Sequence, residues 1–209
     1  TDERVTRHWV SSVGRMFLEH KCDFVLYSED DQIISRSFEA DVSKILDAFE
    51  MCPTCWSINM GCRGDCWGRA ENNSNAVIRM ESGNTGVIYT RHGFEALMKH
   101  ADTFCDMLGN WDVNLHTMAA LGHIKPHALT YLLPRIYHLS TCRSSRTGDT
   151  YRTHCDRSTE IATFLASDRP ADRLLIDRGI APFSPGSTHY AKADALTKER
   201  CLLGFQPTF

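Results

Sequence analysis

Hydrophobic residues near the N-terminus recur at the spacing of an amphipathic helix. The apolar positions fall three or four residues apart with polar positions between them, as one buried helix face requires. This pattern predicts a helix over residues 3–20. The positions that carry it are Val5, Trp9, Val13, Met16 and Phe17.

Two short runs rich in β-branched and aromatic residues follow this helix, at residues 24–28 and 33–38. They flank the acidic segment Glu29-Asp30-Asp31. Strand-like runs on either side of a polar turn predict a β-hairpin. We interpret Asp30 and Asp31 as turn residues before acid–base groups, because Asp is frequent in turns.

Helical stripes also occur in the rest of the chain. The apolar positions between Phe94 and Leu108 form the most regular of them. Another begins at Pro126, and Pro134 must kink or split it because proline cannot donate a backbone hydrogen bond. The pattern predicts helices at residues 42–49, 94–108, 126–136, 159–167 and 171–178.

A second hairpin completes the predicted fold. Residues 76–80 and 87–90 are strand-like and flank a glycine-containing turn. We predict an α+β fold, mostly helical, with two β-hairpins bracketing a four-cysteine metal-binding loop. At 209 residues, the chain is predicted to be a single domain over 1–209. The alternative is a zinc-containing part at 1–110 and a helical part at 111–209.

Charge and hydropathy argue against two classes of function. The formal net charge of −3 provides no overall attraction to nucleic acid or to an anionic membrane. The longest apolar run is far shorter than the ~18 residues of a spanning helix, so we expect no membrane span.

Cysteine and histidine are unusually frequent, with nine Cys and ten His. Metal binding would use both residue types, whereas disulfides would explain only the cysteines. An odd number of cysteines also leaves a disulfide framework incomplete. We therefore expect a reducing, intracellular compartment, with secretion as the alternative.

Four cysteines lie close together in the chain at CxxC and CxxxC spacing. Thiolates at this spacing can close on one tetrahedral Zn²⁺, and a site with four protein ligands would support folding rather than catalysis. An iron–sulfur cluster would use the same four ligands. The predicted ligands are Cys52, Cys55, Cys62 and Cys66.

The same segment permits two other interpretations. In an oxidising compartment, a Cys62–Cys66 disulfide would constrain Arg63-Gly64-Asp65 as a preorganised, integrin-type recognition loop. Alternatively, the pair Cys52 and Cys55 would be a thiol–disulfide redox motif, although a helix precedes it where a strand is expected.

Histidines concentrate between residues 92 and 154. A second, mixed metal site could form from His138, Cys142, His154 and Cys155, across a long loop. Scattered surface or hydrogen-bonded histidines explain the same pattern.

A basic loop lies between residues 141 and 157. Its arginines could contact phosphate through their bidentate forks, and its tyrosine could stack on a base. The alternative is a solvated loop whose arginines pair with acids elsewhere. The candidate nucleic-acid-binding residues are Arg143, Arg146, Tyr151, Arg152 and Arg157.

These features predict a zinc-stabilised, intracellular, non-enzymatic domain that contacts nucleic acid or a protein partner. One alternative is a secreted disulfide-bonded module that presents the Arg-Gly-Asp loop. The other is a hydrolase that uses one Cys and one His. No GxSxG, HExxH, P-loop or dinucleotide motif occurs, so we assign no catalytic residue. The sequence does not indicate an oligomeric state.

Overall fold

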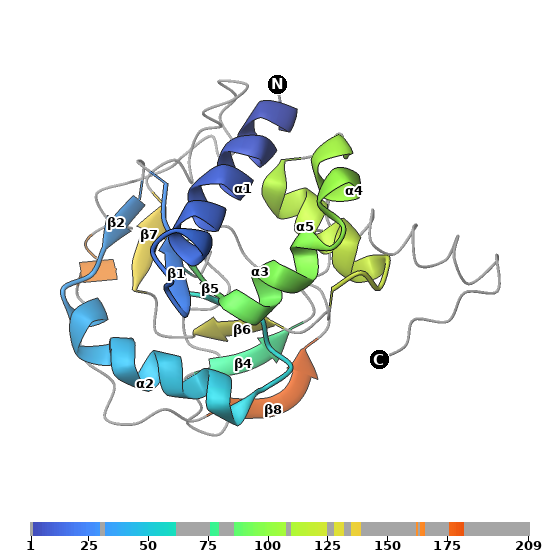
Figure 1. The fold of residues 1–209 in the computed structure, drawn as a ribbon. Coiled ribbons are helices and arrows are strands. Elements are labelled where there is room, and N and C mark those ends of the chain that lie inside the picture. Colours follow the sequence, from blue (N-terminus) through green and yellow to red (C-terminus); the bar gives the residue numbers. More distant parts are fainter. Residues whose placement is uncertain are drawn as a thin grey trace, which may run out of the picture.

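The structure, a computed structural model, describes residues 2–29, 32–61, 76–79, 86–107, 110–124, 128–131, 135–138, 162, 164–165 and 176–181. Helices and strands are mixed along this part of the chain (Figure 1). The helices are α1 (Asp2–Leu18), α2 (Ser37–Met51), α3 (Arg91–Met98), α4 (Ala101–Asp106) and α5 (Trp111–Ala120). The strands are β1 (Phe24–Tyr27), β2 (Gln32–Ile34), β3 (Ser57–Asn59), β4 (Ala76–Arg79), β5 (Val87–Thr90), β6 (Ala128–Tyr131), β7 (Ile136–His138) and β8 (Ile176–Ala181).

Six strands form the main sheet, in the order β1-β5-β3-β6-β4-β8. β3 pairs with β6, and β4 with β8, in parallel, whereas the other neighbours are antiparallel. A separate two-stranded sheet joins β2 to β7. The main sheet is therefore mixed and draws its strands from distant parts of the chain.

Hydrophobic side chains pack on both faces of the main sheet. On one face, Val87 and Tyr89 of β5 join a cluster with residues of α1, α3, α4 and α5. On the other face, Ile88 of the same strand joins a cluster with Ile45 and Phe49 of α2. Because side chains of a strand alternate between faces, β5 contributes to both clusters. Helices therefore cover both sides of the sheet (Figure 1).

The helix predicted at residues 3–20 is confirmed as α1. Its stripe packs as expected, since Trp9, Val13 and Phe17 are all buried. The α+β class is also confirmed.

The two predicted hairpins are wrong in their pairing, although strands occur at all four predicted places. β1 pairs with β5 rather than with β2, and β2 pairs with β7. β5 pairs with β1 and β3, whereas β4 pairs with β6 and β8. The physical reason is burial. All four residues of β5 are buried, so its backbone N–H and C=O groups need hydrogen-bond partners from a strand on each edge.

Predictions in the second half of the chain were less accurate. The stripe at 94–108 forms two helices, α3 and α4. The region predicted as a helix at 126–136 contains β6 and the start of β7, because a short apolar run cannot distinguish a buried strand from a helix. β8 overlaps the helix predicted at 171–178, and α5 was not predicted.

Within the described ranges, no helix combines the length and apolar content needed to cross a bilayer.

Candidate active site

Glu29 and His138 lie close together although they are far apart in the sequence. Glu29 follows the end of β1, and its Oε2 lies 3.6 Å from Nε2 of His138. His138 is the last residue of β7. Both side chains are partly buried, 31% and 11% exposed respectively. A carboxylate oxygen and an imidazole nitrogen are thus within ion-pair distance of each other.

The pairing of β2 with β7 creates this proximity. Its antiparallel register places His138 opposite Gln32, the first residue of β2. The amide of Gln32 donates to the carbonyl of Glu29 at 3.2 Å. Ser28 Oγ donates to Oε1 of Gln32 at 2.9 Å. These bonds hold the end of β1 beside the end of β7.

A second carboxylate, Asp112, lies in the first turn of α5 and is 9% exposed. The positive end of a helix favours an acidic residue at this position. The preceding residue, Trp111, contacts Tyr27 at the end of β1, with ring centroids 5.3 Å apart. The start of α5 therefore packs against the strand that leads to Glu29.

Tyr89 links the two carboxylates electrostatically. Its pKa is raised well above the ordinary value of a tyrosine, chiefly because the side chain is buried. The next largest cause is the negative charge of Asp112, and Glu29 adds a smaller effect in the same direction. Asp112 and Glu29 therefore both favour the protonated form of this buried hydroxyl.

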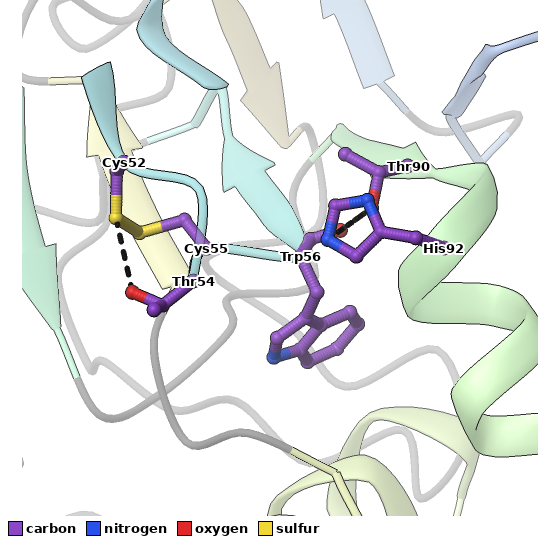
Figure 2. The surroundings of a disulfide bond; sticks show 6 residues. All are labelled: Cys52, Thr54, Cys55, Trp56, Thr90 and His92. Atoms are coloured by element: carbon purple, nitrogen blue, oxygen red, sulfur yellow. Dashed lines mark hydrogen bonds between the residues drawn. A yellow bond between two sulfur atoms is a disulfide. The ribbon is translucent and has the colours of Figure 1, made fainter. Parts of the chain in front are cut away.

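Cys52 and Cys55 form a disulfide where α2 ends (Figure 2). Cys52 is 4% exposed and Cys55 is fully buried. Sγ of Cys52 lies 3.7 Å from Oγ1 of Thr54. The next residue, Trp56, is tied to β5 because its carbonyl accepts hydrogen bonds from the amide and the hydroxyl of Thr90. The disulfide therefore joins the end of α2 to the start of β3.

This disulfide removes the support for the predicted zinc site. A disulfide sulfur lacks the thiolate charge that a zinc ligand needs. The other two predicted ligands, Cys62 and Cys66, lie outside the described residues. Nowhere in the described ranges do three or more His, Cys, Asp or Glu side chains form a group able to hold a metal ion. The expectation of a zinc-binding domain is therefore corrected.

The other predicted sites fall mostly outside the described residues. Of the mixed metal site, the structure places only His138, beside Glu29. The Arg-Gly-Asp segment at 63–65 also lies outside. So does every predicted nucleic-acid-binding residue: Arg143, Arg146, Tyr151, Arg152 and Arg157.

The family model of N-acetylglucosaminyltransferase II (MGAT2) matches residues 6–180. The chain belongs to the N-acetylglucosaminyltransferase II family. The match includes both segments that supply Glu29 and His138, as well as α5 with Asp112. No curated protein matches the chain.

Membership of the N-acetylglucosaminyltransferase II family overturns the functions predicted from the sequence. A glycosyltransferase family differs in chemistry from a zinc-stabilised binder of nucleic acid or protein, from an Arg-Gly-Asp recognition module and from a Cys/His hydrolase. Those three predictions are wrong. Their shared error was to take the cysteine cluster as the functional centre of the chain.

Sequence reasoning missed Glu29 and Asp112 as functional candidates. A usable signal for Glu29 was the run of three acids directly after a β-rich segment. For Asp112 it was the spacing of Trp111, Leu115 and Met118, which marks the buried face of α5 and places Asp112 in its first turn.

Proposed function

We propose that this protein transfers N-acetylglucosamine from a nucleotide-activated donor to a hydroxyl group of an acceptor. The observation that carries the proposal is membership of the N-acetylglucosaminyltransferase II family over residues 6–180. The convergence of Glu29 and His138 supports it, because a charged donor needs polar groups grouped at one place.

Such a transfer makes two chemical demands on the protein. The acceptor oxygen forms a bond with the anomeric carbon of the sugar, and the bond from that carbon to the donor's diphosphate oxygen breaks. The diphosphate leaves with the bonding electrons, so its charge must be stabilised. The hydroxyl proton must pass to a base, which is commonly a carboxylate or a histidine.

We assign Asp112 as the base that takes the acceptor's proton. Its carboxylate is nine-tenths buried at the start of α5. Water exclusion of this kind strengthens the electrostatic effect of a carboxylate. The preceding residue, Trp111, packs against Tyr27, two residues before Glu29, which supports a position of Asp112 near the Glu29–His138 pair.

Glu29 and His138 suit the other demand, stabilisation of the leaving diphosphate. Their oxygen and nitrogen, 3.6 Å apart, fit two ligands of one divalent cation. A cation held by few protein ligands commonly completes its shell with substrate phosphate oxygens and water. When bound, it would neutralise charge on the departing diphosphate.

We further propose that the protein works in an oxidising compartment, contrary to the intracellular, reducing location expected from the sequence. The Cys52–Cys55 disulfide supports this, since disulfides form and persist in oxidising environments such as the secretory route.

The test is transfer activity on a panel of glycan acceptors, with UDP-N-acetylglucosamine as the first donor. Asp112→Asn keeps the side chain's size but removes its basicity, and we expect kcat to fall by about 100-fold to 10,000-fold. Glu29→Gln is expected to reduce kcat by about 100-fold. The readouts are released nucleoside diphosphate and the mass gain of the acceptor.

Two exposed acids provide matched controls. Asp106→Asn and Glu19→Gln make the same chemical changes at surface ion pairs with Arg7 and Arg15. Both variants should retain full activity. If the folded wild-type protein transfers no N-acetylglucosamine to any acceptor, the proposed function fails. If Asp112→Asn is as active as Asp106→Asn, the assigned base is wrong.

A further inference from the structure

A buried arginine lies directly before the strand that carries His138. Arg135 precedes β7, and its side chain is fully buried. The guanidinium donates to one oxygen of Asp41, Oδ2, from Nε at 3.0 Å and from Nη2 at 2.7 Å. Asp41, on α2, is also fully buried. This ion pair therefore joins the start of β7 to α2, the helix that covers the face of the main sheet opposite to α1.

Two neighbours complete the surroundings of the carboxylate. The hydroxyl of Tyr131 donates to the same Oδ2 at 3.0 Å, and Nζ of Lys44 lies 3.6 Å from Oδ1. The Arg135 guanidinium also lies 5.5 Å from the centre of the Tyr131 ring. Burial, followed by the negative charge of Asp41, raises the pKa of Tyr131, so its hydroxyl stays a donor.

The backbone of Arg135 is held as firmly as its side chain. Its amide donates to the carbonyl of Met60, after β3, at 2.8 Å. Its carbonyl accepts from the amide of Ser35, after β2, also at 2.8 Å. Arg135 is thus anchored to α2, to the end of β3 and to the end of β2.

The strand pair that presents His138 needs such an anchor. β2 and β7 share only three residue pairs, and β2 is not fully buried. Two-stranded sheets are marginally stable on their own. Ile136 and Tyr137 of β7 are buried, but no residue of β2 is, so burial holds the register of only one of the two strands. A slip of one residue would turn His138 to the opposite face of the strand, away from Glu29.

A buried ion pair is better suited to fixing the register of β7 than an apolar contact would be. A buried pair often contributes little net stability compared with a hydrophobic pair of the same size. Its hydrogen bonds are directional, however, and two donors of a planar guanidinium that converge on one carboxylate oxygen restrict where the guanidinium can lie. The geometry at Arg135 therefore specifies where β7 begins and, three residues later, where His138 lies.

We propose that Arg135 and Asp41 are positioning residues for the active site: their buried ion pair sets the register of β7 that brings His138 to Glu29. The catalytic importance of this positioning rests on the proposed function. The positioning itself does not.

The test measures the Glu29–His138 contact in the folded protein, without enzymatic turnover. Histidine is labelled with ¹³C and ¹⁵N, and the His138 signal is assigned from its loss in His138→Gln. Glu29→Gln should shift the His138 ring resonances in the wild-type background. In Arg135→Lys and Asp41→Asn backgrounds, we expect this response to shrink to the level caused by the control change Glu19→Gln. Circular dichroism must show that each background is folded.

Two milder variants provide the same test if Arg135→Lys or Asp41→Asn does not fold. Tyr131→Phe removes one hydrogen bond to Asp41 and leaves the ion pair, and Asp41→Glu keeps the charge but displaces it. Each should reduce the His138 response in part. If His138 responds fully to Glu29→Gln in every folded background, the ion pair does not position β7 and the proposal is overturned.

Activity then separates this proposal from the proposed function. If the wild-type protein transfers N-acetylglucosamine, Arg135→Lys should lower kcat by about 100-fold at saturating donor, as expected for a misplaced catalytic group. If the wild-type protein shows no transfer, the resonance experiment still decides the positioning role.

Discussion

Trp9 and Trp111 stack with their ring planes 5° apart and their ring centroids 5.6 Å apart. The stack joins the middle of α1 to the first residue of α5, next to Asp112. Trp9 also contacts Tyr89 edge-on, with centroids 5.1 Å apart. Trp9, which fills the core between these helices, thus also supports the position of Asp112, the candidate base.

We predict that Trp9→Ala destabilises the protein by about 3–5 kcal/mol, because it removes a fully buried indole and its ring contacts. Urea unfolding measures the loss. Val5→Ala is the control on the same helix, since Val5 is 43% exposed, and it should cost less than about 1 kcal/mol. A loss for Trp9→Ala no larger than that for Val5→Ala would show that this contact does not stabilise the core.

Gly86 has a backbone conformation that other residues rarely adopt, with φ of 56°. A Cβ at this position would overlap the side chain of Ile136 on β7. We therefore predict that Gly86→Ala costs about 1–3 kcal/mol from overpacking, in addition to the strain of positive φ. Urea unfolding is again the measurement.

The double variant Gly86→Ala/Ile136→Val tests the overlap. Ile136→Val removes Cδ1, the atom nearest to the added Cβ, but keeps Cβ and Cγ1 at 2.9 Å, so the double variant should recover part of the loss and retain the backbone strain. Gly14→Ala, in a helix and facing only the tip of the Phe94 ring, should be much milder. Equal effects of Gly86→Ala and Gly14→Ala would contradict the predicted overlap.

The sequence predicted local structure better than it predicted pairing. α1 was predictable because Trp9, Val13 and Phe17 encode one buried face within a single segment. The partner of β1 was not, because Phe24 pairs with Thr90 across much of the chain. Periodicity shows that a segment is a strand but carries no information about which distant strand it joins.

The candidate site was hidden for the same reason. The sequence predicts Glu29 as a turn residue because it predicts that the following strand pairs with β1. His138 lies near Cys142 in the sequence, whereas the β2–β7 pairing brings it to its spatial neighbour Glu29. For Cys52 and Cys55, CxxC spacing suits a metal or a disulfide equally, and the two sulfurs are bonded here.

The raised pKa values of Tyr89 and Tyr131 predict a loss of stability in alkali. Both hydroxyls hold their protons more tightly in the folded than in the unfolded chain, where tyrosine titrates near pH 10. The stability that this provides is fully present below about pH 10. It is lost as the pH rises from there toward the folded-state values, because the unfolded chain releases its protons first.

Tyr131→Phe tests this linkage. At pH 7 the variant should be less stable by about 1 kcal/mol, the usual net value of the lost hydrogen bond to Asp41. Above about pH 10 the difference from wild type should narrow by up to about 1.4 kcal/mol per pH unit. Urea unfolding at several pH values measures the difference. A gap that stays constant up to pH ~11 would show that Tyr131 titrates normally in the fold.

The Cys52–Cys55 disulfide predicts which thiols a reagent can reach. Both sulfurs are buried and bonded to each other, whereas Cys22 is a half-buried free thiol. Alkylation of the native protein without reductant should therefore modify Cys22 and leave Cys52 and Cys55 unmodified. Peptide mass mapping should find the peptide spanning 52–55 about 2 Da lighter than its dithiol form. A chelator should change neither result, because no metal is needed to protect bonded sulfurs.

Reducing this disulfide should destabilise the protein only modestly. The chain-entropy estimate for so short a closed loop is about 2 kcal/mol, well below the value for a long loop. The paired variant Cys52→Ser/Cys55→Ser should lose a similar amount in urea unfolding, compared with Cys22→Ser as the control. If Cys52 and Cys55 of protein isolated without reductant alkylate as rapidly as Cys22, they are free thiols. The proposal of an oxidising compartment would then lose its support, because it depends on this bond.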